Sequence, residues 1–533
     1  MVAEKNHLFS DFIPSTGTLQ QVGGTGGLSG LYNPDKKNFS PRASIVWDVN
    51  GKGSTVIRAG FGLFFDAFSQ DMMLGHLPYP TFYAPGPAYN NIGPGSVQMA
   101  NVNPAAFDAN GVYIPNTPYF GAPNCTVECD IFSFDRNIKT PYMENYNINI
   151  QHQFSSKVSL QLGYVGSQGH RLFRFLDINQ PSQAAITAAD CPNGIATCAT
   201  TGAIQDFTVP RVFPSSFNNY GAVYIFQENS SGQSNYHSLQ ASFRVANYHG
   251  FTSLVNYVWS KSLDNSSDGE DFVVNAAQPQ NSAAPQLEKG PSNFNIPNRF
   301  VWIASYAFPK MGGRMAKLKD GWGVDSAATL QSGQPFTLNY NFEDDYSGGG
   351  DGFDRPDVVG PIVYNKRNPY NFLQMSSFAM PCTSGQTLQT YSGFASDCVP
   401  GTRHYGNLGR NALVGPTFKQ WDLAIFKDTA LTEHLTMQLR ADFFNILNHP
   451  NFSNPVLPAF IADPAANPIS PLFLYPDLVT HGCACGFAPP NSAGREVGNG
   501  AYQITATGDV GIGNPFLGGG GPRGIQIAAK FTF

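Results

Sequence analysis

One stretch near the carboxyl end of the chain alternates strictly between apolar and polar side chains. Its apolar residues fall on one side of an extended chain and its polar residues on the other: Leu435, Met437, Leu439, Ala441 and Phe443 against Thr436, Gln438, Arg440 and Asp442. A period of two residues is typical of a β-strand with one apolar and one polar face. The final stretch Ile525–Phe533 repeats the pattern. The rest of the chain indicates whether the apolar face packs in a soluble core or contacts lipid.

The same two-faced pattern recurs along the chain, with connections that are alternately short and long. The predicted strands are Arg42–Asp48, Thr55–Phe65, Asn145–Phe154, Val158–Tyr164, Tyr236–Val245, Phe251–Lys261, Arg299–Phe308, Trp322–Leu338, Trp421–Lys427, Leu435–Leu447 and Ile525–Phe533. Residues up to Lys37 and the stretches 66–140 and 170–235 are rich in Gly, Pro and Asn, and we expect them to be loops. Aromatic residues crowd the strand ends, among them Trp47, Trp259 and Trp421.

This combination indicates an all-β, antiparallel transmembrane β-barrel of about eleven strands, with short periplasmic turns and long external loops. The polar face would line a wet lumen, and Tyr146, Ile148 and Ile150 would face lipid. A soluble β-sandwich or β-propeller is the alternative, but its strands would be shorter, at about five or six residues, and its loops more even.

Composition excludes several other classes of protein. Charged residues make up 13% of the chain, about half the usual share. A net charge of −6 without a basic cluster argues against nucleic acid as the partner. No apolar run of about 18 residues exists, so no transmembrane helix is expected. The start of the sequence lacks a secretory signal, and we expect the chain to be a fragment of a longer polypeptide.

Several segments resemble strands of TonB-dependent outer-membrane receptors, in the Oar-like branch with a carboxypeptidase-regulatory-like N-terminal domain. These are Asn38–Asp48, Val56–Asp66, Tyr164–His170, Leu439–Asn448 and the Pro522-Arg523 pair before the last strand. The resemblance implies a barrel of 22 strands around a plug domain. Residues 1–533 would then be the C-terminal half of the barrel domain, without the plug. It also implies energised uptake of a bulky ligand of unknown identity in the outer membrane of a Gram-negative cell, with TonB as a partner.

All the cysteines fall in the expected loops, in pairs that are close in sequence: Cys125 and Cys129, Cys191 and Cys198, Cys382 and Cys398, Cys483 and Cys485. The pairing indicates local disulfides in an oxidising compartment. We expect Cys191–Cys198 and Cys382–Cys398 to be bridged. The pairing of Cys483 with Cys485 stays open, because bridging such close neighbours strains the geometry. Metal binding at His481–Cys485 is the alternative for that pair.

Other candidate chemistry is sparse. Gly349–Asp354 matches one turn of a calcium-binding nonapeptide repeat, with Asp351 and Asp354 as oxygen ligands. A single copy favours a solvated acidic loop instead, so we expect no metal site and no cofactor. No nucleophile elbow, phosphate loop or zinc-protease pattern appears, and we expect no catalytic residues and no enzyme activity. The alternative function is surface adhesion or a structural role through disulfide-braced loops.

Overall fold

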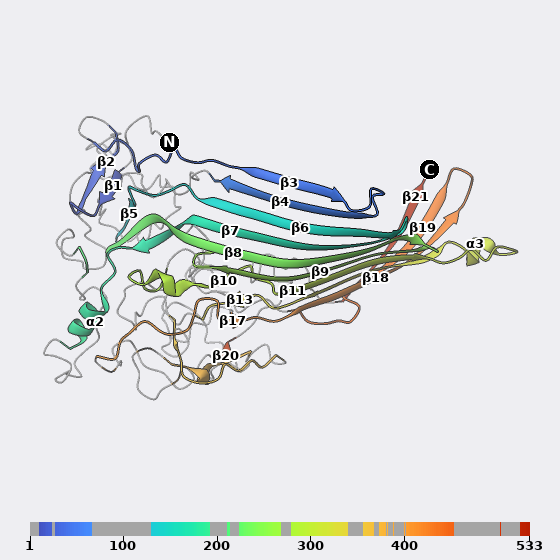
Figure 1. Ribbon diagram of the computed structural model, residues 1–533. Coiled ribbons are helices and arrows are strands. Elements are labelled where there is room, and N and C mark those ends of the chain that lie inside the picture. Colours follow the sequence, from blue (N-terminus) through green and yellow to red (C-terminus); the bar gives the residue numbers. More distant parts are fainter. Residues whose placement is uncertain are drawn as a thin grey trace, which may run out of the picture.

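The computed structural model describes residues 10–23, 27–66, 129–191, 211–213, 223–267, 279–338, 355–366, 372–379, 381, 387, 399, 401–451, 501–502 and 523–533. Its main feature is an antiparallel meander in which spatial order follows the chain (Figure 1). The path runs through eleven strands: β3 (Arg42–Asp48), β4 (Thr55–Phe65), β6 (Tyr142–Ser155), β7 (Val158–Asp177), β8 (Val223–Tyr248), β9 (Phe251–Asp264), β11 (Asn298–Ala307), β12 (Trp322–Gln331), β18 (Phe418–Ala430), β19 (Thr436–Phe444) and β21 (Gly524–Thr532).

The predicted fold class is confirmed, and each predicted strand has its counterpart in the meander. The first two strands have the predicted bounds. Strands β7 and β8 run much further than predicted, to Asp177 and from Val223, because they stay paired beyond the alternating region across two register shifts. The strand that starts at Trp322 ends at Gln331 rather than Leu338.

Smaller elements gather at the end of the sheet where the long connections lie (Figure 1). They are β1 (Ser10–Ile13), β2 (Thr18–Gln21), β5 (Cys129–Phe134), α2 (Gln183–Asp190), η5 (Pro285–Glu288), β10 (Gly290–Pro291), β13 (Pro335–Phe336), β14 (Asp357–Val358), β15 (Leu373–Gln374), η7 (Met375–Ser377), β16 (Phe378–Ala379), β17 (Leu413–Val414) and β20 (Ala501–Tyr502). The expectation that residues up to Lys37 form only loop is wrong, because β1 and β2 pair as a hairpin. Strand β5 also lies in a predicted loop, and it pairs in parallel with β8.

The opposite end of the sheet carries the tight turns and the helix α3 (Ala316–Lys319) (Figure 1). The β8–β9 connection shows why these turns are short. His249 and Gly250 are its two central residues, and both have positive φ, at 50° and 83°. That conformation matches the right-handed twist of the flanking strands. We call this side the short-turn end and the other side the long-loop end.

Most of the large buried apolar side chains among the described residues lie at the long-loop end. Phe134, Ile138 and Leu31 form one cluster there, and Phe12 is also fully buried. Along the meander, by contrast, large apolar side chains remain exposed. No described helix has the length and apolar character needed to cross a membrane.

Candidate functional site

One face of the meander presents a continuous row of apolar side chains to its surroundings. Cross-strand pairing aligns Ile45, Ala59, Ile148, Tyr164, Leu239 and Trp259 from β3 to β9. Ile45 is 63% exposed and Trp259 is 60% exposed. In water such a contiguous surface would drive association. It is suited to contact with lipid hydrocarbon.

Two tryptophans on this face have their indole N–H groups hydrogen-bonded to a neighbouring strand. Trp302 Nε1 donates to Ser253 Oγ at 3.0 Å, and Trp421 Nε1 donates to Ser326 Oγ at 2.9 Å. A bare N–H facing hydrocarbon would cost several kcal/mol, on the order of a lost hydrogen bond in an apolar medium. The sheet therefore satisfies its own polar atoms on the apolar side.

The other face of the meander carries a ladder of amides. Gln161 Nε2 donates to Asn149 Oδ1 and Asn149 Nδ2 donates to Asn147 Oδ1, each at 3.3 Å. Arg58 Nη1 donates to Gln151 Oε1 at 2.9 Å. These side chains belong to β4, β6 and β7, and they make a hydrated lining for a lumen.

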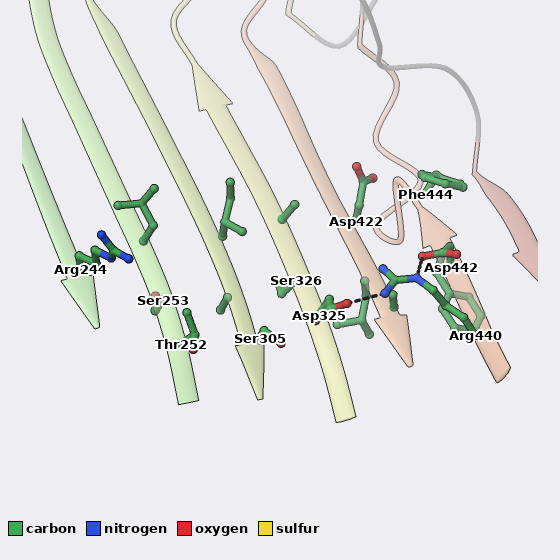
Figure 2. Close-up of a pocket in the computed structure, with 17 residues that line it drawn as sticks. Arg244, Thr252, Ser253, Ser305, Asp325, Ser326, Asp422, Arg440, Asp442 and Phe444 are labelled. Atoms are coloured by element: carbon green, nitrogen blue, oxygen red, sulfur yellow. Dashed lines mark hydrogen bonds and ion pairs between the residues drawn. The ribbon is translucent and has the colours of Figure 1, made fainter. Parts of the chain in front are cut away.

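Near the short-turn end this polar face is hollowed by a pocket of about 480 Å³ (Figure 2). Arg440 of β19 bridges two carboxylates there, with Nη1 2.5 Å from Asp325 Oδ2 and Nε 2.7 Å from Asp442 Oδ1. A third carboxylate, Asp422, accepts the backbone N–H of Asn445 at 2.8 Å. The exposed Arg244 lines the far side. Arg440 therefore links β19 to β12 by charge, and the acids of the pocket are already partnered.

The long-loop end contains buried ion pairs between segments far apart in sequence. Arg355 donates two hydrogen bonds to the carboxylate of Glu288 in η5, with N–O distances of 2.6 and 2.7 Å. Both side chains are almost fully buried. Arg410 pairs with Asp264 at the end of β9 and also donates Nε to the Glu288 carbonyl oxygen at 2.9 Å. Bidentate, charge-assisted bonds of this kind fix orientation as well as contributing energy. The long connections here are thus folded onto one another.

His404 and Asp357 form a more exposed pair in the same region. His404 Nε2 lies 2.6 Å from Asp357 Oδ2, and Nδ1 lies 2.6 Å from the carbonyl oxygen of Thr402. The hydrogen bond to Asp357 raises the pKa of His404. Both ring nitrogens face acceptors and neither faces a hydroxyl. The arrangement stabilises an imidazolium ion, and it does not form a catalytic dyad with a nucleophile.

The structure describes few of the side chains singled out from the sequence. Cys191 takes part in a disulfide bond, and its pairing with Cys198 stays a prediction. Cys129 contributes its backbone to β5. The remaining cysteines and the calcium candidates lie outside the described residues: Cys125, Cys198, Cys382, Cys398, Cys483, Cys485, Asp351 and Asp354. Within the described residues, no group of three or more His, Cys, Asp or Glu side chains could hold a metal ion.

Sequence reasoning missed the buried arginines and their carboxylate partners. Arg355, Arg410 and Glu288 sit in segments that read as polar loops, and polar loops are usually solvated. Their partners lie up to 146 residues away in sequence. The local signal is that Arg355 and Arg410 lie beside sequence rich in Gly and Pro. Such sequence is too common to indicate a site.

Comparison with known proteins shows the family to which the chain belongs. A family model for the outer membrane beta barrel domain matches residues 1–464. The chain belongs to the outer membrane beta-barrel domain family. Its apolar face therefore meets lipid in the cell outer membrane. In such barrels the short turns face the periplasm and the long loops face outward.

Several solved structures are similar to this family member. The outer membrane transporter YddB from Escherichia coli is 13% identical, with a TM-score of 0.37, over 78% of this chain and 37% of that chain. The siderophore receptor PiuA from Acinetobacter baumannii is 6% identical, with a TM-score of 0.35, over 92% and 35%. The ferripyoverdine receptor of Pseudomonas aeruginosa is 10% identical, with a TM-score of 0.30, over 82% and 31%. The chain thus spans about a third of their length. A comparison with curated proteins finds no match.

Proposed function

We propose that the chain is the C-terminal part of the barrel of a TonB-dependent receptor of the Oar-like branch, which takes up a bulky ligand across the outer membrane. The observation that carries this proposal is the polarity of the meander. One face suits lipid, the other suits a wet lumen, and the folded long-loop end stands where an external ligand would arrive. The sequence resemblance described above supports the choice of branch and of TonB as the energising partner.

The edges of the meander support the view that further strands complete the barrel. Antiparallel neighbours alternate in direction, so β3 and β21, at the two ends of an eleven-strand path, run the same way. An all-antiparallel barrel therefore closes only with an odd number of additional strands. Eleven more would give the 22 strands of plugged outer-membrane transporters. We infer that these strands and a plug domain belong to the same longer polypeptide.

Capture by TonB tests this proposal. The native protein would be extracted from outer membranes and passed over an immobilised periplasmic domain of TonB, with residues 1–533 alone as the matched control. We expect the native protein to be retained and the control to flow through, since the TonB-contacting segment would precede the barrel. Peptide mapping of the retained protein should show sequence upstream of Met1. A native protein that begins at Met1, inserts in the membrane and does not bind TonB would refute the receptor proposal.

A second proposal is adhesion to a surface or matrix through the loops. The buried ion pairs that tie η5, β9 and residues 401–412 together favour it, because a rigid external layer suits a binding surface. Deleting the gene separates the two functions. Loss of attachment with unchanged ligand uptake would favour adhesion, whereas loss of uptake with unchanged attachment would favour the receptor.

A further inference from the structure

The buried charges around η5 do not balance. Three guanidinium groups and two carboxylates make up what we call the arginine cluster: Arg174, Arg355, Arg410, Glu288 and Asp264. Arg355 is bound by Glu288 and Arg410 is bound by Asp264. Within the part of the chain that the structure describes, no carboxylate is hydrogen-bonded to Arg174, from the outer part of β7. The cluster as a whole carries one more positive than negative charge.

Arg174 is enclosed, so water does not compensate its charge. Its side chain is 1% exposed. Nη1 donates to the carbonyl oxygen of Pro285 at 3.2 Å. Within the described residues, Nε and Nη2 have no hydrogen-bond acceptor. An arginine does not lose its proton in proteins, and a buried charge without a partner costs several kcal/mol.

The two unpartnered atoms have a specific geometry. Nε–H and the Nη2–H beside it lie on one edge of the planar guanidinium and donate in parallel. A carboxylate or phosphate group accepts two such parallel hydrogen bonds, whereas a spherical ion accepts them less well. Arg355 makes a comparable pair of parallel hydrogen bonds to Glu288 in the same cluster, through its Nη1 and Nη2 atoms.

No acidic residue in the described part of the chain is placed to take this edge. Glu288, Asp264 and Arg410 are the charged groups that act on Arg174, and both acids are committed elsewhere. Glu228, on the adjacent strand β8, pairs across from Phe175, while Arg174 pairs across from Asn229. Cross-strand partners share a face and successive residues alternate, so Glu228 points to the opposite side of the sheet.

From this geometry we propose that Arg174 is an anion-binding residue, which takes a planar or tetrahedral oxyanion, a carboxylate or a phosphate, on its Nε–Nη2 edge. The site is formed by β7, η5 and the segment around Arg410. Access requires η5 to move away from β7, because the Pro285 carbonyl covers the guanidinium. The proposal does not depend on transport, and it applies equally to a free anion and to an acidic group on a larger molecule.

The test is hydrogen exchange of the full chain in detergent, followed at peptides covering residues 172–177 and 279–291. Sodium formate and inorganic phosphate are the probes, and sodium chloride at equal ionic strength is the reference. We expect saturable protection with the oxyanions beyond the chloride curve. Arg174→Gln should weaken the apparent affinity by about tenfold or more. Arg299→Gln, an exposed arginine on β11, should leave it unchanged.

The outcomes separate a binding site from a structural arginine. Equal protection by chloride, or protection that persists in Arg174→Gln, would overturn the proposal. Should Arg174→Gln fail to fold, Arg174→Lys keeps the charge and loses the fork, and a tenfold weaker oxyanion effect is then expected. A wild-type chain that shows no saturable oxyanion dependence contradicts the proposal without any variant. A synthetic peptide with a free carboxyl terminus, compared with its amide, distinguishes a tethered acid from a free anion.

Discussion

Asp11 shows at the scale of one residue how burial competes with hydrogen bonding. It is fully buried in the β1–β2 hairpin, where Oδ1 accepts the backbone N–H of Phe134 at 2.9 Å. Loss of hydration raises the pKa of Asp11 to about 8, against the opposing effects of the Phe134 hydrogen bond and the nearby Arg136 charge. At neutral pH the carboxyl is therefore largely protonated, and the hairpin is docked on β5 through a neutral acid.

The pH dependence of this docking follows from the sign of the shift. A raised pKa means that the folded state binds the proton more tightly than the unfolded state, so stability falls as the pH rises. We expect hydrogen-exchange protection of residues 10–21 to decrease as the pH rises toward about 8 and to level off above it. Asp11→Asn keeps the acceptor oxygen and cannot ionise, so its protection should stay flat between pH 6 and 9. Equal pH dependence in both proteins would contradict the assignment to Asp11.

The His404–Asp357 pair is more exposed than Asp11, and its contribution to stability changes over a different pH range. The hydrogen bond that His404 donates to Asp357 raises the pKa of His404 above its ordinary value of 6.5. Burial acts against the Asp357 anion, but the hydrogen bonds from His404 and Asn407 outweigh it and hold the pKa of Asp357 below 3.8. The contribution of His404 is fully present below pH 6.5 and is lost as the pH rises through the raised value. That of Asp357 is lost only in strong acid.

We therefore expect protection of residues 401–408 to weaken as the pH rises from about 6 to 9. His404→Asn removes the titrating ring and should abolish that decline while leaving the β14–β16 pairing intact. The readout is hydrogen exchange at this segment, with the turn at His249 and Gly250 as an internal reference. A wild-type profile that is flat over this pH range would show that the pair does not stabilise the loop.

These residue-scale features lay largely beyond sequence reasoning. Asp11 and Asp357 occur in stretches rich in Gly, Pro and Asn, which suggest solvated loops. What distinguishes them is a partner segment over a hundred residues away for Asp11, and one about fifty away for Asp357. Irregular segments that dock on distant parts of the chain show no periodic pattern in their sequence. The sequence therefore predicted that long loops exist here but not that they fold.

At the scale of elements the sequence was far more informative, because a two-faced strand must alternate. Strands β3 and β4 could be bounded to the residue. The outer parts of β7 and β8 could not, since around Gly169, Leu172 and Gly232 the register shifts and the alternation is lost. Bulges of this kind keep a ladder paired while they scramble its side-chain pattern. Strand β5 was missed because a short parallel addition to β8 lacks a recognisable hairpin turn.

A charge introduced on one face of β6 is expected to cost more stability than the same charge on the other face. Ile148 is 46% exposed on the lipid-facing side, whereas Asn147 lies on the amide ladder. We expect Ile148→Arg to lower the free energy of unfolding by about 2–4 kcal/mol, since its guanidinium must enter hydrocarbon. Asn147→Arg, one residue away, should have a mild effect because its side chain reaches the wet lumen. Refolding titrations into lipid vesicles give both values, and equal costs would reverse the assigned orientation.

At the scale of the whole molecule the question is how the meander closes. Both edge strands are exposed along most of their length, and they run in the same direction. Unpaired strand edges cannot be satisfied by lipid. A direct β3–β21 closure would be parallel, which is unlike the antiparallel pairing of every other neighbour in the meander. Under the proposed function, further strands of the same receptor barrel would pair with these two edges.

This argument has a consequence for residues 1–533 on their own. We expect the purified chain, reconstituted into planar bilayers, to give no reproducible ligand-sensitive conductance, because an eleven-strand sheet leaves two edges that compete for irregular pairing. The matched sample is the native protein extracted from outer membranes, which under the proposed function should give stable insertion. Irregular, lipid-dependent current steps from the isolated chain are compatible with open edges. Uniform single-channel conductance that responds to a ligand would show instead that these residues close a functional barrel by themselves.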